Sequence, residues 1–367
     1  MNETPDRINT NRVVYYDILR IIAAFAVVLL HCSSEKWYSY EENTYPWQIF
    51  NVYDSLVRFG VPLFVMLTGS VMGDPDKEFS IKKLWGKNIL RLVVVYLFWH
   101  FFYIFADKEA LLELKAYFPH HVRSTLEVLV NSSAHLWYMN MIICIYAIIP
   151  VLRLITGNEK ILRYAVKLSV LFSFVIPTVL NFPYLTEEPH LIIVINAVKG
   201  RFFSAREYHL NFEYISYFLI GYYLSTVPVG KKEAIKYGLF GLLGFITTWA
   251  VSAAYSGHTG NTYGFYGYGN INVFAEAVGI FMIVKYFASK HCFKKKTVMI
   301  LTRAADCCFG AYLIHVFVID RLSYLGFTTV AFDPVFAVPC KAIITFAVSL
   351  LLSEILHHIP LIRKYIV

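Results

Sequence analysis

The chain has 367 residues, of which 57% are hydrophobic and 16% charged, and its mean hydropathy is +0.54. This composition is far more apolar than that of a soluble domain of the same length, which excludes an ordinary soluble protein. The net charge of +8 would suit a nucleic-acid-binding protein, but the basic residues lie in short segments between long apolar runs. They therefore indicate membrane topology, and we expect no nucleic-acid partner.

We expect about ten membrane-spanning helices, because ten apolar runs recur that are each long enough to cross a hydrocarbon core of about 30 Å. Helices satisfy their own backbone hydrogen bonds in lipid, and the runs lack the alternation of barrel strands. The expected spans are residues 14–32, 53–73, 87–106, 135–155, 163–182, 211–227, 236–256, 271–288, 303–324 and 334–355. The predicted fold is all-α: one polytopic membrane domain over residues 1–367.

Lysine and arginine residues predict the orientation of these spans. With the N-terminus inside, the cytoplasmic segments hold 21 of these residues and the outer segments hold 7. Cytoplasmic loops of membrane proteins carry such an excess, so both termini are expected in the cytoplasm. The longest outer segments, 107–134 and 183–210, are candidates for holding a large acceptor.

The sequence predicts no cleavable signal peptide and no function for its cysteines beyond packing. The apolar stretch of the first span is too long for a cleavable signal peptide, and no small-residue cleavage site follows it. The six cysteines show no metal-ligand spacing, and we interpret them as packing residues. We therefore expect neither a metal site nor a disulfide framework.

The first span carries an arginine and a histidine on one helical face. Arg20 and His31 are separated by ten apolar residues, and a step of 11 residues returns to within about 20° of the same face. The two residues would lie about 16 Å apart along the axis. A charged arginine at membrane depth costs roughly 2.5–3.5 kcal/mol, so it requires a partner or a function. Asp17 is one possible partner, and snorkelling to the inner headgroups is the other structural interpretation.

The second span contains Pro62 between two glycines, Gly60 and Gly69. Proline removes a helical hydrogen bond and clashes with the preceding turn, so a kink or a broken helix is expected. The kink is either a packing feature or a bend that opens an outer pocket beside Arg58.

The other polar residues at membrane depth form two layers. Those near the inner side are Lys87, Arg91, Asp306 and Glu354. Those near the outer side are Asp54, Arg58, His135, Trp137, Tyr138, Glu276, His315 and Arg321. A pore would carry polar residues through its middle. Two separate layers instead suit a molecule that enters from one face and reacts near the other.

Several of these residues also have a purely structural interpretation. Lys87 is an interfacial anchor under this interpretation, and Trp137 and Tyr138 belong to an aromatic belt. His135 marks only a helix boundary, and Glu354 is structural rather than chemical. The combination of face, depth and nearby charge favours a chemical role for His31.

The outer segment 257–270 is uncharged and rich in tyrosine and glycine, with Tyr266 near its centre. Aromatic faces and neutral hydrogen-bonding groups commonly hold sugars. The segment therefore suits a carbohydrate platform, and it suits an aromatic interface loop about equally well.

Five stretches occur in a characteristic order along the chain. They are Arg20 to His31, residues 61–64 with 68–70, the basic start of the third span ending at Arg91 and followed by Tyr96, residues 135–138, and residues 309–315. Together they resemble the acyltransferase 3 family of bacterial integral-membrane acyltransferases. The resemblance covers essentially the whole chain and is closest to the stand-alone members that decorate surface or exported polysaccharides.

This resemblance implies a catalytic role for His31 and an acyl-donor role for Arg20 and Arg91. The family pattern in the third span is two arginines three residues apart, whereas here Asn88 stands three residues before Arg91, with Lys87 beside it. This departure weakens that half of the motif. The resemblance also implies a multi-pass protein of the bacterial inner membrane. It further implies acetyl-CoA or another acyl-CoA as co-substrate, no permanently bound cofactor, and a saccharide or lipid-linked glycan as acceptor.

The chemistry agrees with the two polar layers. Arginine and lysine near the inner face can bind the phosphates of coenzyme A, and the thin pantetheine arm has a length comparable to the separation of Arg20 and His31. A neutral His31 can act as general base or can carry the acyl group. Arg58, His315 or Tyr312 could stabilise the oxyanion or orient His31.

The acceptor is expected to contact five outer residues: His135, Trp137, Tyr138, Glu276 and Tyr266. The main alternative is a transporter of polysaccharide or acyl-sugar, which also suits buried charges and a broken helix. A transporter would not consume acyl-CoA. A sensor or scaffold would give no reason for Arg20 and His31 to share a face.

Overall fold

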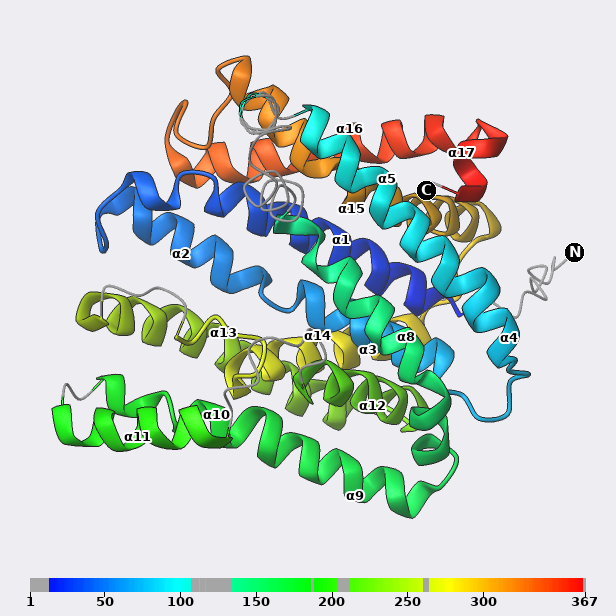
Figure 1. The fold of residues 1–367 in the computed structure, drawn as a ribbon, viewed down its shortest axis with the longest axis horizontal. Helices are drawn as coiled ribbons and strands as arrows, with labels where there is room; N and C mark the ends of the chain where they lie inside the picture. Colours follow the sequence, from blue (N-terminus) through cyan, green and yellow to red (C-terminus); the bar gives the residue numbers. More distant parts are fainter. Residues whose placement is uncertain are drawn as a thin grey trace, which may run out of the picture.

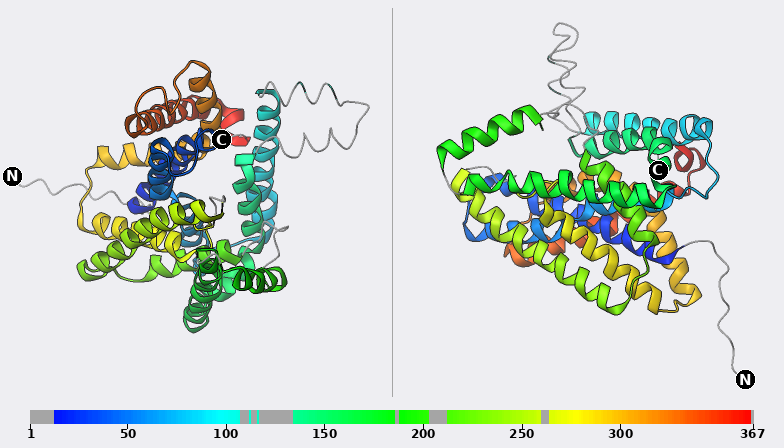
Figure 2. Two further views of the ribbon diagram at one scale, coloured as in Figure 1. Left: turned by 90° about the vertical axis from the view of Figure 1, so that its left-hand side faces the viewer. Right: turned by 90° about the horizontal axis from the view of Figure 1, so that it is seen from below.

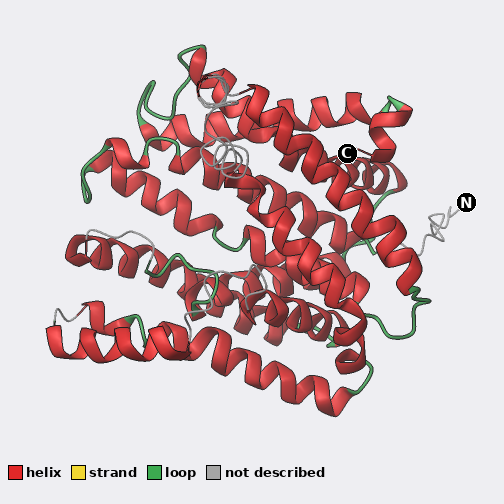
Figure 3. Ribbon diagram, in the orientation of Figure 1, coloured by secondary structure: helices red, strands yellow, loops and turns green. Residues whose placement is uncertain are grey.

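The computed structural model describes residues 13–106, 134–185, 188–202, 212–259 and 264–365, together with the single residues 112 and 116. All regular secondary structure in these ranges is helical (Figure 3). Within them, nine helical segments are long and apolar enough to cross a membrane. The predicted all-α polytopic fold is therefore confirmed. The expected span 211–227 forms a helix too, but it is shorter, with 15 residues.

The helices follow the expected spans in order (Figure 1). The first span is α1 (Val14–Ser34), and the second comprises α2 (Tyr45–Val57) and α3 (Gly60–Met72). The third comprises α4 (Ile81–Lys83), η2 (Leu84–Ile89) and α5 (Leu90–Ala106). The fourth is α8 (Trp137–Thr156), and the fifth comprises α9 (Glu159–Ser169), η4 (Val170–Val175) and α10 (Ile176–Val179). The last five are α12 (Phe212–Thr226), α13 (Lys231–Thr259), α14 (Ile271–Lys290), α15 (Lys295–Tyr324) and α16 (Pro334–His357). Shorter elements are η1 (Trp37–Ser39), η3 (Ala134–Leu136), η5 (Phe182–Leu185), α11 (Pro189–Phe202) and α17 (Pro360–Tyr365).

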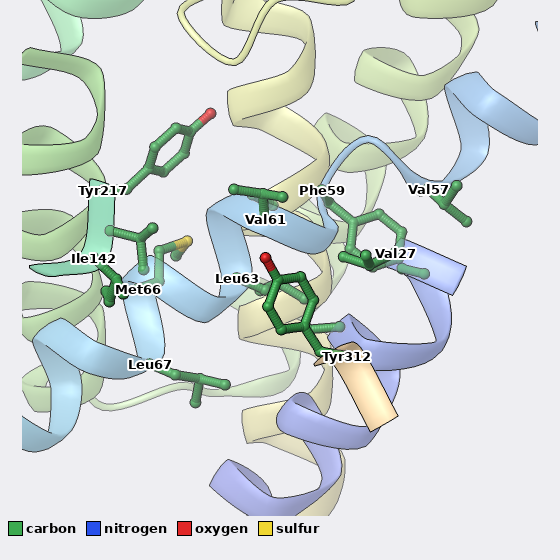
Figure 4. Close-up of a cluster of buried hydrophobic side chains, with 14 of the residues drawn as sticks. Val27, Val57, Phe59, Val61, Leu63, Met66, Leu67, Ile142, Tyr217 and Tyr312 are labelled. Carbon is green, nitrogen blue, oxygen red and sulfur yellow. The ribbon is translucent and has the colours of Figure 1, made fainter. Parts of the chain in front are cut away.

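Helix α1 lies at the centre of the bundle, where it packs against α2, α3, α14, α15 and α16. Its apolar residues allow this central position, since Ala23, Ala26 and Leu19 are all at most 1% exposed. Helices α5 and α8 contact each other and form one flank of the bundle (Figure 2). Figure 4 shows the buried side chains that join α1 to α3, α8 and α12, among them Val27, Leu63 and Ile142. The core therefore surrounds the helix that carries both Arg20 and His31.

Helices α3 and α12 approach each other closely because glycines meet backbone at their contact. A Cβ atom on Gly69 would lie 1.9 Å from the carbonyl oxygen of Phe218, and one on Gly221 would lie 2.1 Å from that of Met66. The Ser70 hydroxyl donates to the Gly221 carbonyl oxygen at 2.9 Å. Small residues and a hydroxyl bond commonly hold helices together in lipid, where hydrophobic burial does not drive their association.

The orientation of the bundle can be tested by labelling single cysteines in a cysteine-free background. Tyr38 follows α1 on the expected outer side and is 76% exposed, whereas Lys296 is exposed in the first turn of α15 on the expected inner side. We expect an impermeant thiol reagent to label Tyr38→Cys in intact cells and to spare Lys296→Cys, which should react only after permeabilisation. Labelling of Lys296→Cys in intact cells would reverse the predicted topology.

Candidate active site

Three histidines from distant parts of the sequence meet at one end of α1. The His31 ring on α1 lies 5.0 Å from the His315 ring on α15, measured between centroids. The His135 ring, which η3 places just before α8, lies 6.0 Å from the His315 ring. His315 is 0% exposed. The structure thus brings together three predicted site residues, which we call the histidine cluster.

The hydrogen bonds of His315 define its tautomer. Its Nδ1 donates to the carbonyl oxygen of Tyr312, because a carbonyl oxygen can only accept. Its Nε2 is buried and has no hydrogen-bond partner within the described ranges. A neutral His315 therefore offers a lone pair beside His31. It can accept a hydrogen bond and orient His31, but it has no free N–H to donate to an oxyanion.

Three tyrosines surround the histidine cluster. The Tyr312 hydroxyl donates to the His135 carbonyl oxygen at 2.9 Å, and its ring lies 5.5 Å from that of Tyr138. The Tyr103 ring on α5 packs edge-on against His135 at 4.3 Å. Of the predicted acceptor-contacting residues, His135 and Tyr138 thus lie at or next to the cluster.

The second span is broken, and the break is not at the proline. Of the two expected outcomes, a kink or a broken helix, the structure shows the broken helix, with a turn at Arg58 and Phe59 between α2 and α3. Pro62 lies in the first turn of α3, where its missing N–H would have no helical partner in any case. The proline therefore starts a helix, and the break leaves Arg58 as the C-terminal cap of α2.

Arg58 is held by a buried carboxylate and an aromatic ring. Its Nε donates to Asp54 Oδ2 at 2.6 Å, and its guanidinium carbon lies 4.4 Å from the centre of the Tyr266 ring. The Asp54 side chain is 1% exposed and that of Arg58 is 13% exposed, so the carboxylate is buried and the guanidinium group is only partly exposed. Arg58 also interacts electrostatically with His31. A fixed positive charge therefore lies near the predicted base.

The described part of the tyrosine-rich segment, residues 264–270, turns into the bundle. Tyr266 is 2% exposed, and its hydroxyl donates to Asn51. Burial raises the pKa of this hydroxyl, which keeps it protonated as a donor. The Tyr268 ring stacks on Trp137 at 5.9 Å with an interplanar angle of 23°. Tyr266 therefore packs against Arg58, and Trp137 on α8 packs against Tyr268. The sugar-binding role of this segment stays a prediction.

Glu276 lies in the same buried polar region as Arg58. It is 3% exposed, accepts a hydrogen bond from Thr248, and interacts electrostatically with Arg58 and Asp54. Its second oxygen, Oε2, is buried without a hydrogen-bond partner among the residues that the structure describes. A buried carboxyl oxygen that lacks a hydrogen-bond partner is a suitable contact for a substrate hydroxyl.

A basic groove lies at the opposite end of α5 and α15. Its volume is about 990 Å³, and it is bounded by η2, α5, α15, α16 and α17. Its cationic and histidine side chains are Lys87, Arg91, Arg303, His357, His358 and Arg363. Lys87 belongs to the π-helix η2, an irregularity that often marks functional sites. The predicted donor residues Lys87 and Arg91 are thus together, and we call this feature the basic groove.

Arg20, the third predicted donor residue, does not line the basic groove. Its Nη1 lies 3.5 Å from Asp17 Oδ1, so the predicted i,i+3 pair is present at the edge of hydrogen-bond range. The Tyr146 hydroxyl on α8 interacts electrostatically with both Arg20 and Arg91. Both arginines therefore lie within electrostatic range of one tyrosine on α8.

Comparison with protein families settles the class of protein. The model for the acyltransferase 3 family, described as an acyltransferase domain, matches residues 13–354. The chain belongs to the acyltransferase 3 family. No curated protein and no solved structure matches it. This protein is therefore a multi-pass membrane acyltransferase, as the five stretches of sequence implied.

Sequence reasoning missed one buried charged cluster in this acyltransferase. Lys341 on α16 is 0% exposed, and its Nζ donates to Glu35 Oε2 at 2.7 Å and to Ser323 Oγ at 2.6 Å. Glu35 caps the C-terminus of α1, four residues after His31. This cluster ties the end of α1 that carries the predicted base to α15 and α16. A lysine within the last apolar run was the available sequence signal.

Arg303 and Arg363 were also missed as groove residues, because the sequence showed them only as cytoplasmic charges. Arg303 Nε donates to Glu354 Oε1 at 2.9 Å, which agrees with the structural interpretation of Glu354. Arg363 lies on α17, a short helix that follows α16 directly. Nothing in the linear spacing indicated that this segment would turn toward α5.

Proposed function

We propose that this acyltransferase moves an acyl group, with acetyl as the expected group, from acyl-CoA at the inner face to a saccharide hydroxyl at the outer face. The observation that carries the proposal is that α5 and α15 each join the basic groove to the histidine cluster. Arg91 precedes Tyr103 by twelve residues, and Arg303 precedes His315 by twelve. Twelve residues of α-helix span about 18 Å.

The basic groove suits the nucleotide end of acyl-CoA. Coenzyme A carries several phosphate charges, and arginine guanidinium groups bind phosphate through paired hydrogen bonds. The groove presents Arg91, Arg303 and Arg363 from three different helices. A pantetheine arm that leaves this groove along α5 and α15 would bring the thioester toward the histidine cluster. The donor would thus remain on the cytoplasmic side while its reactive carbon reaches the outer side.

The histidine cluster suits the transfer itself. His31, as general base, takes the proton of an acceptor hydroxyl while the hydroxyl oxygen attacks the thioester carbon. The carbon–sulfur bond breaks, and the proton returns to the thiolate of coenzyme A. In the acyl-carrier route, a ring nitrogen of His31 attacks the thioester carbon and expels the coenzyme A thiolate. The acceptor hydroxyl then attacks the acyl carbon, the bond to the His31 nitrogen breaks, and the hydroxyl proton goes to the thiolate. Arg58 supports either route as a nearby positive charge.

The proposed reaction predicts a chemical change on surface glycans. Mass spectrometry of surface or lipid-linked glycans from cells with and without this protein should show ester-linked acyl groups only when the protein is present. Mild base should release these groups, since they are esters. Identical glycans in both strains would contradict a saccharide acceptor.

The donor site can be tested by removing one arginine at a time. We expect Arg91→Ala and Arg303→Ala each to raise the KM for acyl-CoA by about tenfold, as the loss of one charge-assisted bond predicts, and to leave the acceptor KM unchanged. Arg20→Ala should act in the same direction. Arg163→Ala is the control, because Arg163 is an exposed cytoplasmic residue that pairs with Glu159 outside the groove. A change confined to the acceptor KM would show that the groove is not the donor site.

A further inference from the structure

The hydroxyl of Tyr103 bridges two backbone groups on either side of His315. It donates to the Leu313 carbonyl oxygen at 2.7 Å and accepts from the Phe317 N–H at 3.3 Å. Residues 313 and 317 are the two partners of one i to i+4 helical hydrogen bond. A side chain that inserts at such a pair locally adjusts the helix. His315 is the middle residue of this turn.

Tyr103 also contacts a second member of the histidine cluster. Its ring packs edge-on against His135 at 4.3 Å, and Tyr103 is 6% exposed. The hydroxyl thus acts on the turn that carries His315, while the ring supports His135. These are separate contacts, so removing the oxygen alone would leave the packing against His135 in place.

We propose that Tyr103 is a positioning residue, an inference that rests on the proposed function. Tyr103 holds the α15 turn, so that His315 Nε2 stays free to accept a hydrogen bond from His31. The His315 Nδ1 bond to the Tyr312 carbonyl belongs to the same turn and leaves Nε2 buried and unpartnered among the described residues. The His31 ring is the neighbouring histidine, at 5.0 Å. An acceptor for one ring nitrogen of His31 fixes the other nitrogen as the base.

The test compares Tyr103→Phe with a matched control, Tyr53→Phe. The Tyr53 hydroxyl also donates to one backbone carbonyl, that of Val335, but on α16. In the acyl-transfer assay, we expect Tyr103→Phe to lower kcat by about tenfold and to leave both KM values within twofold. Tyr53→Phe should change none of these constants by more than twofold. A wild-type kcat in Tyr103→Phe, or an equal loss in both variants, would overturn the inference.

A spectroscopic measurement separates positioning from the transfer reaction itself. His291, His357 and His358 also place Nδ1 against a backbone carbonyl oxygen, so several Nδ1-protonated signals are expected in protein labelled with ¹⁵N-histidine. The signal of His315 is the one that disappears in His315→Gln. Tyr103→Phe should shift or split this signal, and Tyr53→Phe should not. An unchanged signal in Tyr103→Phe would contradict the inference even if transfer activity fell. If wild-type protein transferred no acyl group, this result would contradict the proposed function. The ¹⁵N-histidine measurement would still test whether Tyr103 positions His315, because it does not depend on acyl transfer.

Discussion

His31→Gln and His31→Ala should abolish acyl transfer while the protein remains folded and inserted in the membrane. Loss of a positioned general base typically lowers the rate by 10²–10⁴-fold, and loss of an acyl-carrying nucleophile should lower it at least as much. Glutamine keeps a neutral polar side chain of similar length but cannot take up the hydroxyl proton. The measurement is transfer of a labelled acyl group from acyl-CoA to glycan in membranes that carry each variant.

His100→Gln is the matched control for this experiment. His100 is another histidine in a membrane span and is 6% exposed, but it stacks on Tyr96 and lies outside the histidine cluster. We expect His100→Gln to retain transfer within a few-fold of wild type. Near wild-type transfer by His31→Gln would show that His31 is structural, and His315 or His135 would then be the leading candidate for the base.

Lys341→Met should destabilise the folded protein by about 3–5 kcal/mol, the usual effect of removing one partner of a buried ion pair. Among the described residues, the substitution leaves the Glu35 carboxylate, which is 11% exposed, with the hydrogen bonds from Ser323 and from the Thr329 N–H. The free energy of unfolding in denaturant, followed by tryptophan fluorescence in detergent, measures the loss.

The double variant Glu35→Gln with Lys341→Met removes both charges and should recover most of this stability, because no unpaired charge stays buried. Lys296→Met, at an exposed position, should change the free energy of unfolding by less than about 0.5 kcal/mol. A single Lys341→Met variant as stable as wild type would show that the cluster does not hold the end of α1.

The spans, and the common outer side of His31, His135 and His315, were accessible from sequence because each follows from a local or periodic signal. Apolar runs are a local property, and the helical period places Arg20 and His31 on one face without any tertiary information. The prediction that His31 and His315 lie near the same side followed from counting spans. Their ring separation of 5.0 Å did not, since it depends on how α1 and α15 pack.

The remaining features depend on contacts between distant segments. Lys341 finds Glu35 only because α16 packs against the end of α1. The position of the break at Arg58 depends on Pro62 starting a new helix, and the same proline within a continuous helix would have produced a kink. Tyr103 looked like an ordinary aromatic residue of an apolar span, because its role comes from backbone groups on α15.

In the proposed reaction, the acyl group crosses from the basic groove to the histidine cluster through one membrane domain. The most direct test uses purified protein in sealed proteoliposomes, with labelled acetyl-CoA enclosed and a de-esterified glycan acceptor outside. We predict that label appears on the outside glycan with wild-type protein and not with His31→Gln, while the vesicles remain impermeable to acetyl-CoA. Glycan labelled only when acetyl-CoA and acceptor are on the same side of the membrane would contradict this account.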